Sequence, residues 1–432
     1  MPDAGADRRW RAPVFLAAVP FIFLMVVFCL FRLDFPYLDQ WEFVPLLAKS
    51  FDGTLGFADF WAQHNEHRLV FPRLIMLVLA RLSHWNVLWE MVVTIALAVV
   101  LFLLLAREYV ELVRAEGRKD SPWALVLISL LVFSLAQWEN WFLGWQLQEL
   151  LSIVAAVAGI LILAHGRGET GHLAASACGI VATFSFANGL IFWMVGLGLV
   201  LFYTRERAWK RVWGEISFGV FFVYLYGFRQ PSYHPGVAAA LFHPIDYALY
   251  VLAYLGAPVM GFSEVGAVVA GLAGLMTLAL LAWRNRGTAA LPVCLAFGAY
   301  AAGSAAFTGL GRVGFGTEQA MSPRYVTFAN LIWIAIAMLA SVGPREAAGS
   351  MCSRIARALA VLAFAGLVSV SSLHGAYRWT ERYHYRIDAR QELLDGNDLD
   401  MLGRIHPEPQ KIIRRRPILM EHGLSIFHER AR

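Results

Sequence analysis

Acidic and histidine side chains gather in one polar segment, residues 33–68, of a chain that is otherwise mostly apolar. A carboxylate within hydrogen-bond reach of a hydroxyl can act as a general base, and histidines beside carboxylates can move protons or bind metals. The segment contains Asp39-Gln-Trp-Glu42 near its start and His64-Asn-Glu66-His67-Arg68 at its end. The candidate catalytic residues are Asp39, Glu42, Glu66 and His67.

Each of these residues also has an ordinary structural explanation. Asp39 can cap a surface helix, on which Asp39 and Glu42 would share one face. Glu66 can be a favourable charge at a helix N terminus, and Arg68 can contact lipid headgroups. His64 and His67 are three residues apart, which is a weak metal-binding spacing. The spacing alone leaves open whether a divalent metal binds.

A second polar cluster lies late in the chain, in the glycine-rich segment 311–325. Guanidinium groups bind phosphate oxygens bidentately, and glycines let backbone N–H groups approach an anion. The segment therefore predicts a phosphate or diphosphate ligand at a membrane surface, although its arginines could instead snorkel to lipid headgroups. The predicted substrate-binding and phosphate-binding residues of the whole chain are Arg68, Glu139, Asn188, Arg312, Arg324 and Tyr325.

The composition defines the class of protein. Hydrophobic residues make up 59% of the 432 residues and charged residues only 16%, which is far more apolar than a soluble domain. The formal net charge of +5 comes from arginines scattered over short loops, so we expect no nucleic-acid partner. The four cysteines lie far apart and indicate neither a disulfide framework nor a cysteine metal site.

The lengths of the hydrophobic runs predict an all-α polytopic membrane protein with about 11 transmembrane helices, in a range of about 10–13. The long run 173–203 is divided at Asn188-Gly189, a turn dipeptide, into two short helices. Leu69–Leu82 and Pro244–Val259 are too short to span, so we expect interfacial helices there. The other predicted spans are 13–32, 87–106, 122–137, 147–165, 212–228, 264–283, 290–309, 326–342 and 355–372.

Basic residues predict the orientation, because cytoplasmic loops are enriched in lysine and arginine. If Leu69–Leu82 does not cross the bilayer, the basic loop around residue 114 is cytoplasmic and the polar segments face outward. The basic residues of that loop are Arg107, Arg114, Arg118 and Lys119. We divide the chain into a membrane domain, 1–372, whose outer loop 33–86 carries the acidic motif, and a polar, extracytoplasmic C-terminal tail, 373–432.

This pattern resembles the GT-C superfamily of integral-membrane glycosyltransferases, which use polyprenyl-phosphate sugars as donors. In that superfamily the first outer loop carries an acidic motif that activates the acceptor or binds a metal, and a His-Pro-Pro-like segment begins a helix at the membrane surface. Asp39-Gln-Trp-Glu42 falls at the acidic motif and Glu66-His67-Arg68 at the second position. No adjacent pair of carboxylates occurs here, and arginine follows His67 in place of proline.

The resemblance implies a GT-C-like fold in the bacterial inner membrane, with the active site facing the periplasm. The implied partners are a polyprenyl-phosphate-sugar donor, a glycan or lipid acceptor of the cell envelope, and the bilayer itself. Asp39 would be the general base, and Arg324, with Arg68 or Arg312, would stabilise the departing phosphate. The resemblance implies no certain cofactor and leaves a divalent metal open.

Two other classes of protein remain open at this point. A transporter or flippase of lipid-linked glycans would use broken helices, and the Asn188-Gly189 break fits that class. An O-antigen polymerase or ligase would also act on lipid-linked glycans, but such proteins concentrate polar residues in a late loop. The polar first loop of this chain favours the glycosyltransferase.

Overall fold

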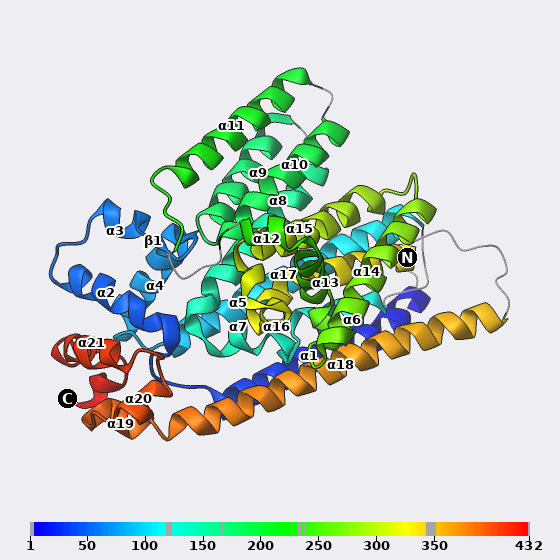
Figure 1. Ribbon diagram of the computed structural model, residues 1–432. Helices are drawn as coiled ribbons and strands as arrows, with labels where there is room; N and C mark the ends of the chain where they lie inside the picture. Colours follow the sequence, from blue (N-terminus) through cyan, green and yellow to red (C-terminus); the bar gives the residue numbers. More distant parts are fainter. Residues whose placement is uncertain are drawn as a thin grey trace.

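The computed structural model describes residues 4–117, 123–165, 168–204, 206–231, 236, 238–342 and 351–430. Arg118 and Lys119 lie outside the described residues. In the described ranges the regular structure is helical except for one two-stranded hairpin, so the predicted all-α class is confirmed. Figure 1 shows most of the helices running in one general direction through a single bundle.

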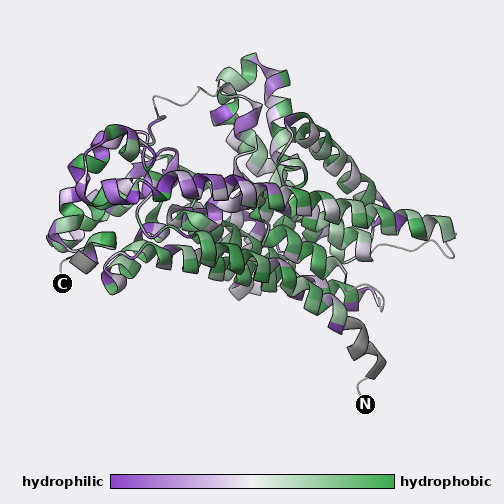
Figure 2. Ribbon diagram, turned by 90° about the horizontal axis from the view of Figure 1, so that it is seen from below, coloured by the Kyte–Doolittle hydropathy of each residue, from purple (hydrophilic) through white to green (hydrophobic). Residues whose placement is uncertain are grey.

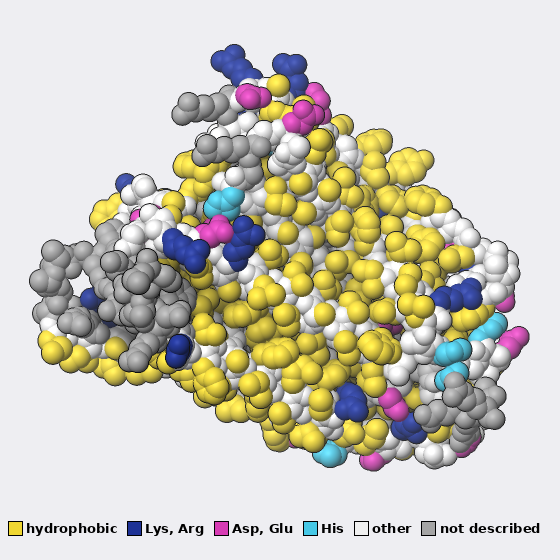
Figure 3. Space-filling view, turned by 180° about the vertical axis from the view of Figure 1, so that it is seen from behind, with side chains coloured by type: hydrophobic (Ala, Val, Ile, Leu, Met, Phe, Trp, Pro, Cys, Tyr) yellow, Lys and Arg dark blue, Asp and Glu magenta, His cyan; other side chains and the backbone are white. Residues whose placement is uncertain are grey.

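Eight helices of the described chain are long and apolar enough to cross a membrane, which identifies a multi-pass membrane protein. Large hydrophobic side chains on the bundle are exposed, among them Phe15, Phe218 and Val265, and Figure 3 shows a broad hydrophobic surface with most charges toward its margins. Such a surface is stable against lipid and unstable against water. The helices over these spans are α1 (Ala4–Phe31), α5 (Leu88–Ala115), α6 and α7 (Ala124–Val132, Trp138–Phe142), α8 (Leu147–His165), α14 (Glu264–Arg284), α15 (Ala290–Arg312), α17 (Val326–Val342) and α18 (Met351–Ile387).

Three further helices belong to the predicted set of about eleven spans but are shorter or less apolar than those eight. They are α9 (Gly168–Thr183), α10 (Leu190–Tyr203) and α11 (Arg207–Leu225). The predicted break between the first two is present, because the 3₁₀ helix η4 (Ala187–Gly189) separates them. A Cβ on Gly189 would lie 2.3 Å from the Ala182 carbonyl oxygen, so this turn requires glycine. The number of spans remains a prediction.

Short elements connect the bundle helices. Between α11 and α14 lie α12 (Ala238–Phe242) and α13 (Pro244–Met260). Helix α13 packs closely on α14 because Gly256 and Gly271 each face backbone of the other helix. The remaining connections are the 3₁₀ helices η2 (Leu135–Gln137), η3 (Gly144–Gln146), η5 (Val313–Phe315) and η6 (Pro323–Tyr325), and helix α16 (Thr317–Ala320).

The loop after α1 folds into a compact group of small elements. They are the 3₁₀ helix η1 (Leu38–Phe43), α2 (Val44–Phe51), α3 (Phe57–Trp61), strands β1 (Gln63–His64) and β2 (His67–Arg68), and α4 (Val70–Ser83). Helices α4 and α13 are therefore present where interfacial helices were predicted to begin at Leu69 and at Pro244. The position of both helices relative to a bilayer remains a prediction. The strands pair antiparallel, with His64 opposite His67.

The C-terminal region packs against this first loop. Helix α18 runs beside α1 and continues past the bundle, where α19 (Arg390–Asp395), α20 (Leu399–Gly403), α21 (Pro409–Glu421) and η7 (Ser425–Arg430) lie beside α2 (Figure 1). The Leu38 amide donates to the Ile405 carbonyl at 3.2 Å, and Arg390 binds Asp34 at 3.1 Å. Hydrophilic residues concentrate at this end of the molecule (Figure 2). The first loop and the tail therefore share one end of the bundle, which we call the loop end.

Candidate functional site

A cavity of about 390 Å³ opens at the loop end of the bundle. The first loop, the start of α8, η4, the end of α11, the end of α15 and η6 each contribute side chains to its wall. Segments far apart in the sequence therefore meet around one space. Seven residues proposed from sequence line it: Asp39, Glu66, His67, Asn188, Arg312, Arg324 and Tyr325.

Asp39 lies at the mouth of the cavity, with 52% of its side chain accessible and its Oδ2 atom 3.9 Å from His64 Nε2. The cavity wall still desolvates the carboxylate, which opposes ionisation, but His64 and the positive charge of Arg324 outweigh burial. The pKa of Asp39 is consequently lower than that of an ordinary aspartate. The side chain is thus a carboxylate at neutral pH, and it is open to an incoming hydroxyl.

Gln40 fixes the turn that carries Asp39. Its side chain accepts a hydrogen bond from the Tyr37 amide at 3.1 Å and donates to Glu90 at 2.7 Å. Glu90 also accepts from the Trp85 indole at 2.9 Å. Because Glu90 is buried at the start of α5, this network attaches the loop to a bundle helix. Asp39 is therefore held by its neighbours and does not itself have to anchor the loop.

The histidine-rich segment forms a tight hairpin. Asn65 adopts a left-handed conformation, with φ of 49°, which asparagine tolerates better than most residues. This turn places His64, Glu66 and His67 on the cavity wall. His67 stacks on Phe186 with ring centroids 4.1 Å apart, and its Nδ1 atom accepts from the Ala187 amide at 3.2 Å.

Two arginines also line the cavity, and each is held by a carboxylate. Arg312 Nε donates to Glu66 Oε1 at 3.1 Å, and Arg324 Nη1 donates to Glu139 Oε2 at 3.1 Å. Arg324 also lies over the Tyr325 ring, 5.1 Å from its centroid. These contacts orient both guanidinium groups before any ligand arrives. Glu139 therefore positions Arg324, and it is not among the residues that line this cavity.

The residues around the start of α8 were not among the predicted site residues. Four of these residues line the cavity and have buried polar atoms without a hydrogen-bond partner in the described structure: Trp145 Nε1, Gln146 Oε1, Gln148 Oε1, and both carboxylate oxygens of Glu149. Glu149 is fully buried. Each unsatisfied buried group costs about 1–3 kcal/mol, so a polar, multiply hydroxylated ligand would be stabilised here. Glu149 could have been noticed as a charge inside a predicted span.

Hydrophobic side chains complete the cavity wall. They come from the end of α11 and from α15, and they are Phe221, Leu225, Phe228, Phe307 and Leu310. Neighbouring side chains on the outer side of α11, Phe218 and Phe222, are 74% and 62% exposed. The cavity lining therefore combines charged side chains, buried polar atoms without a hydrogen-bond partner in the described structure, and apolar side chains next to a helix with exposed hydrophobic residues.

Three of the proposed residues do not line this cavity: Glu139, which holds Arg324, and also Arg68 and Glu42. Arg68 donates to the backbone carbonyls of Trp61, Tyr224 and Tyr226, so it joins the hairpin to the end of α11. Glu42 forms ion pairs with Lys411 at 2.8 Å and Arg415 at 2.9 Å. Although Asp39 and Glu42 lie in one 3₁₀ helix, Glu42 joins the loop to the tail.

Replacing Glu42 by glutamine is expected to destabilise the protein by about 1 kcal/mol at neutral pH. Burial alone would raise the pKa of Glu42, but Lys411 and Arg415 outweigh it and lower that pKa. The stabilisation is therefore complete above the ordinary carboxyl pKa and is lost as the pH falls through the lowered value. Thermal unfolding of wild type and Glu42→Gln across acidic pH tests this. A difference between them that grows toward low pH would contradict it.

Within the described residues, one group of three side chains has ligand atoms close enough for a metal: Glu108, Glu111 and His165. It lies toward the far ends of α5 and α8, away from Asp39. A divalent metal at the Asp39 cavity remains a prediction from the resemblance and from the spacing of His64 and His67.

Comparisons of this chain with protein-family models, with curated proteins and with solved structures gave no match. The function is therefore argued from the chemistry of the cavity.

Proposed function

We propose that the protein is an integral-membrane glycosyltransferase of cell-envelope polysaccharide biosynthesis. It would move a sugar from a polyprenyl-phosphate-linked donor to a glycan or lipid acceptor on the extracytoplasmic face of the bacterial inner membrane. The observation that carries the proposal is that an ionised aspartate, two arginines and an apolar wall meet around one cavity at the loop end. A lipid-linked phosphosugar has groups that complement each of these sides.

In the proposed reaction Asp39 accepts the proton of the acceptor hydroxyl, whose oxygen attacks the anomeric carbon of the donor sugar. The bond between that carbon and the phosphate oxygen breaks, and the polyprenyl phosphate leaves with the bonding electrons. Arg312 and Arg324 stabilise the negative charge on the leaving phosphate. Because Glu66 and Glu139 already hold both guanidinium groups, little reorganisation is needed.

The turn 145–149 would bind the hydroxyl groups of the sugar, with Glu149 as the principal acceptor. Replacing Glu149 by leucine is expected to lower kcat/KM for transfer by about two- to tenfold, because a hydrogen bond of a buried carboxyl group contributes about 0.5–1.5 kcal/mol. The same change is expected to raise the unfolding temperature, since it removes a buried carboxylate without a partner. Transfer assays and thermal unfolding of Glu149→Leu and Glu149→Gln test this. A variant that is less stable and equally active would contradict the assignment.

Transfer in isolated membranes tests the proposed function itself. Membranes with and without the protein are supplied with a labelled polyprenyl-phosphate sugar, and the label entering endogenous glycan or lipid is measured. The proposal predicts transfer that requires the protein. Label that stays on the donor but moves between the two leaflets would instead identify a transporter of lipid-linked sugars, and transfer independent of the protein would reject the proposal.

A further inference from the structure

A second cavity, also of about 390 Å³, lies beside the first. The two are separated by the 3₁₀ helix η6 and the Arg324–Glu139 ion pair. Arg324 and Tyr325 line the first cavity, whereas Ser322, Pro323 and Glu139 line the second. The second cavity is thus a distinct space that shares one wall with the candidate active site.

Helix α18 presents a row of basic side chains to this second cavity. His374, Arg378 and Arg382 all line it, and their spacing of four residues places them on one face of the helix. Arg382 lies over the Trp138 ring, 4.8 Å from its centroid, so its guanidinium is held in place. Within the described chain no carboxylate forms an ion pair with Arg378 or Arg382.

The acidic residues of the cavity do not neutralise this row. Glu139 is already paired with Arg324, and the exposed side chain of Glu318 is the other carboxylate in the lining. Arg378 and Arg382 form no ion pair in the described chain. Among the described lining residues, Glu318 is therefore the one carboxylate that is left to balance their charges. Ser322 and Ser371 also line the wall, but their hydroxyl groups donate to the Gln319 and Ala257 carbonyls. The two guanidinium groups are donors that match the oxygens of a phosphate group.

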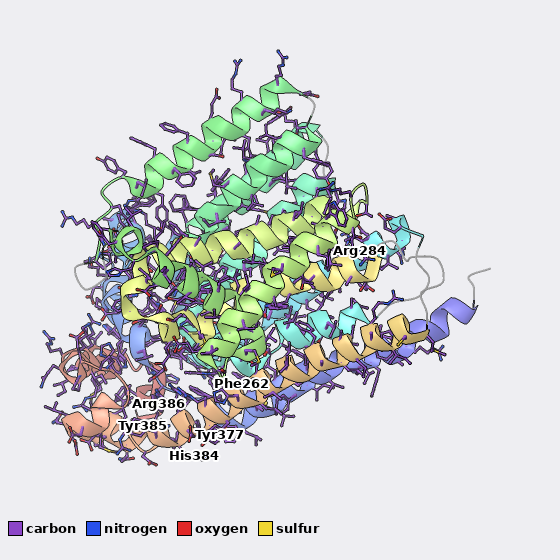
Figure 4. All side chains as sticks on the ribbon, turned by 45° about the vertical axis from the view of Figure 1, so that its right-hand side comes forward. Phe262, Arg284, Tyr377, His384, Tyr385 and Arg386 are labelled. Atoms are coloured by element: carbon purple, nitrogen blue, oxygen red, sulfur yellow. The ribbon has the colours of Figure 1, made fainter. Side chains whose placement is uncertain are left out.

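The rim of the cavity is aromatic and exposed. Phe315, which lines the cavity, is 46% exposed. Phe262 is not part of the lining, but it is 37% exposed and packs edge-on against the lining residue His374 with ring centroids 6.3 Å apart. Figure 4 shows Phe262 and Tyr377 toward the same end of the bundle, while Arg284 marks the opposite end of α14. A ligand that carries both a phosphate and an apolar part would contact the basic wall and this rim together.

We propose that the second cavity is a phosphate-binding site, formed by Arg378 and Arg382 and separated from the first cavity by the Arg324–Glu139 pair. Its ligand carries a phosphate group, supplied either as the headgroup of an anionic lipid or as a soluble phosphate. The site does not depend on the glycosyltransferase proposal, since phosphate binding can be measured without any transfer reaction.

Binding to purified full-length protein in lipid nanodiscs tests the site. One arm titrates inorganic pyrophosphate into protein in phosphatidylcholine discs, and the other measures phosphatidylglycerol retained by the protein in native mass spectra. Arg378→Gln and Arg382→Gln are each expected to weaken binding by about tenfold. Arg414→Gln, an exposed arginine of the tail that donates to the Gln410 carbonyl, serves as the matched control and should bind like wild type.

A variant that should bind more tightly than wild type complements the two arginine variants, because misfolding would not strengthen binding. Glu318→Gln removes a negative charge from the cavity and is expected to strengthen binding by a factor of about three or more, as the loss of a like-charge repulsion should. Retention of the lipid alone would identify a headgroup site, and binding of pyrophosphate alone a site for soluble phosphate. Absence of both in wild type, or equal binding in all variants, would overturn the proposal.

Discussion

Asp39→Asn is expected to lower the rate of sugar transfer by about 10²–10⁴-fold, the usual contribution of a general base. Asparagine has nearly the same shape, but it cannot accept the proton of the acceptor hydroxyl. Gln40 and Glu90 anchor the turn independently of Asp39, so the fold should persist. The measurement is transfer from a labelled polyprenyl-phosphate sugar at equal membrane levels of each variant.

Asp34→Asn is the matched control for this change. Asp34 lies in the same loop and pairs with Arg390, but it does not line the cavity. It should therefore retain nearly full transfer. If both variants lose transfer equally, the loss reflects loop structure, and if Asp39→Asn keeps full transfer, Asp39 is not the base.

The acid dependence of transfer gives a further expected result for Asp39. Its pKa lies below the ordinary value because His64 and Arg324 outweigh burial, so the carboxylate form persists as the pH falls. We therefore expect kcat/KM to decline only below about pH 4, the ordinary aspartate range. A pH–rate profile of the purified protein tests this, provided that unfolding is monitored in parallel. A decline with a midpoint near neutral pH would assign the base to another group, such as a histidine.

Arg324→Gln is expected to lower transfer by about 10²–10³-fold, because the leaving phosphate loses a preorganised cation. The change should also destabilise the protein by about 2 kcal/mol, since Glu139 loses a charged hydrogen-bond partner. These two effects have different causes. Arg324→Lys keeps the charge and should retain intermediate transfer, while the planar two-point contact is lost.

The double variant Arg324→Gln/Glu139→Gln separates binding from stability. Removing both charges should restore much of the unfolding temperature, because neither side chain is then an unpaired ion. Transfer should stay low, since no guanidinium reaches the phosphate. Recovery of transfer together with stability would show that Arg324 has only a structural role.

The sequence predicted the bundle helices well because hydrophobic run length determines whether a segment can cross a bilayer. Even the break at Asn188-Gly189 was predictable, and the structure shows why glycine is needed there. For Asp39 and Arg324 the sequence predicted only that both lie on the same face of the membrane. It did not predict that they line one cavity. Their meeting depends on how distant helices pack, which local patterns do not determine.

Glu42 and Arg68 lie outside the cavity for a common reason. Glu42 and Arg68 have the residue types expected of a site, but their partners are the tail and the carbonyls at the end of α11. Those partners are more than 150 positions away in the sequence. Glu149 was missed for another reason: a single carboxylate inside a predicted span belongs to no local motif, although the charge itself is a signal there. Only the cavity shows that its oxygens lack hydrogen-bond donors.

The most direct test of the central claim is cleavage of the donor by the purified protein alone. The chain is reconstituted in liposomes with a polyprenyl-phosphate sugar labelled in the sugar, and release of the sugar from the lipid phosphate is followed with envelope acceptors present. The glycosyltransferase proposal predicts labelled acceptor and free polyprenyl phosphate in equal amounts, both reduced by about 10²–10⁴-fold in Asp39→Asn. An intact donor that merely changes leaflet, or cleavage unaffected by Asp39→Asn, would contradict it.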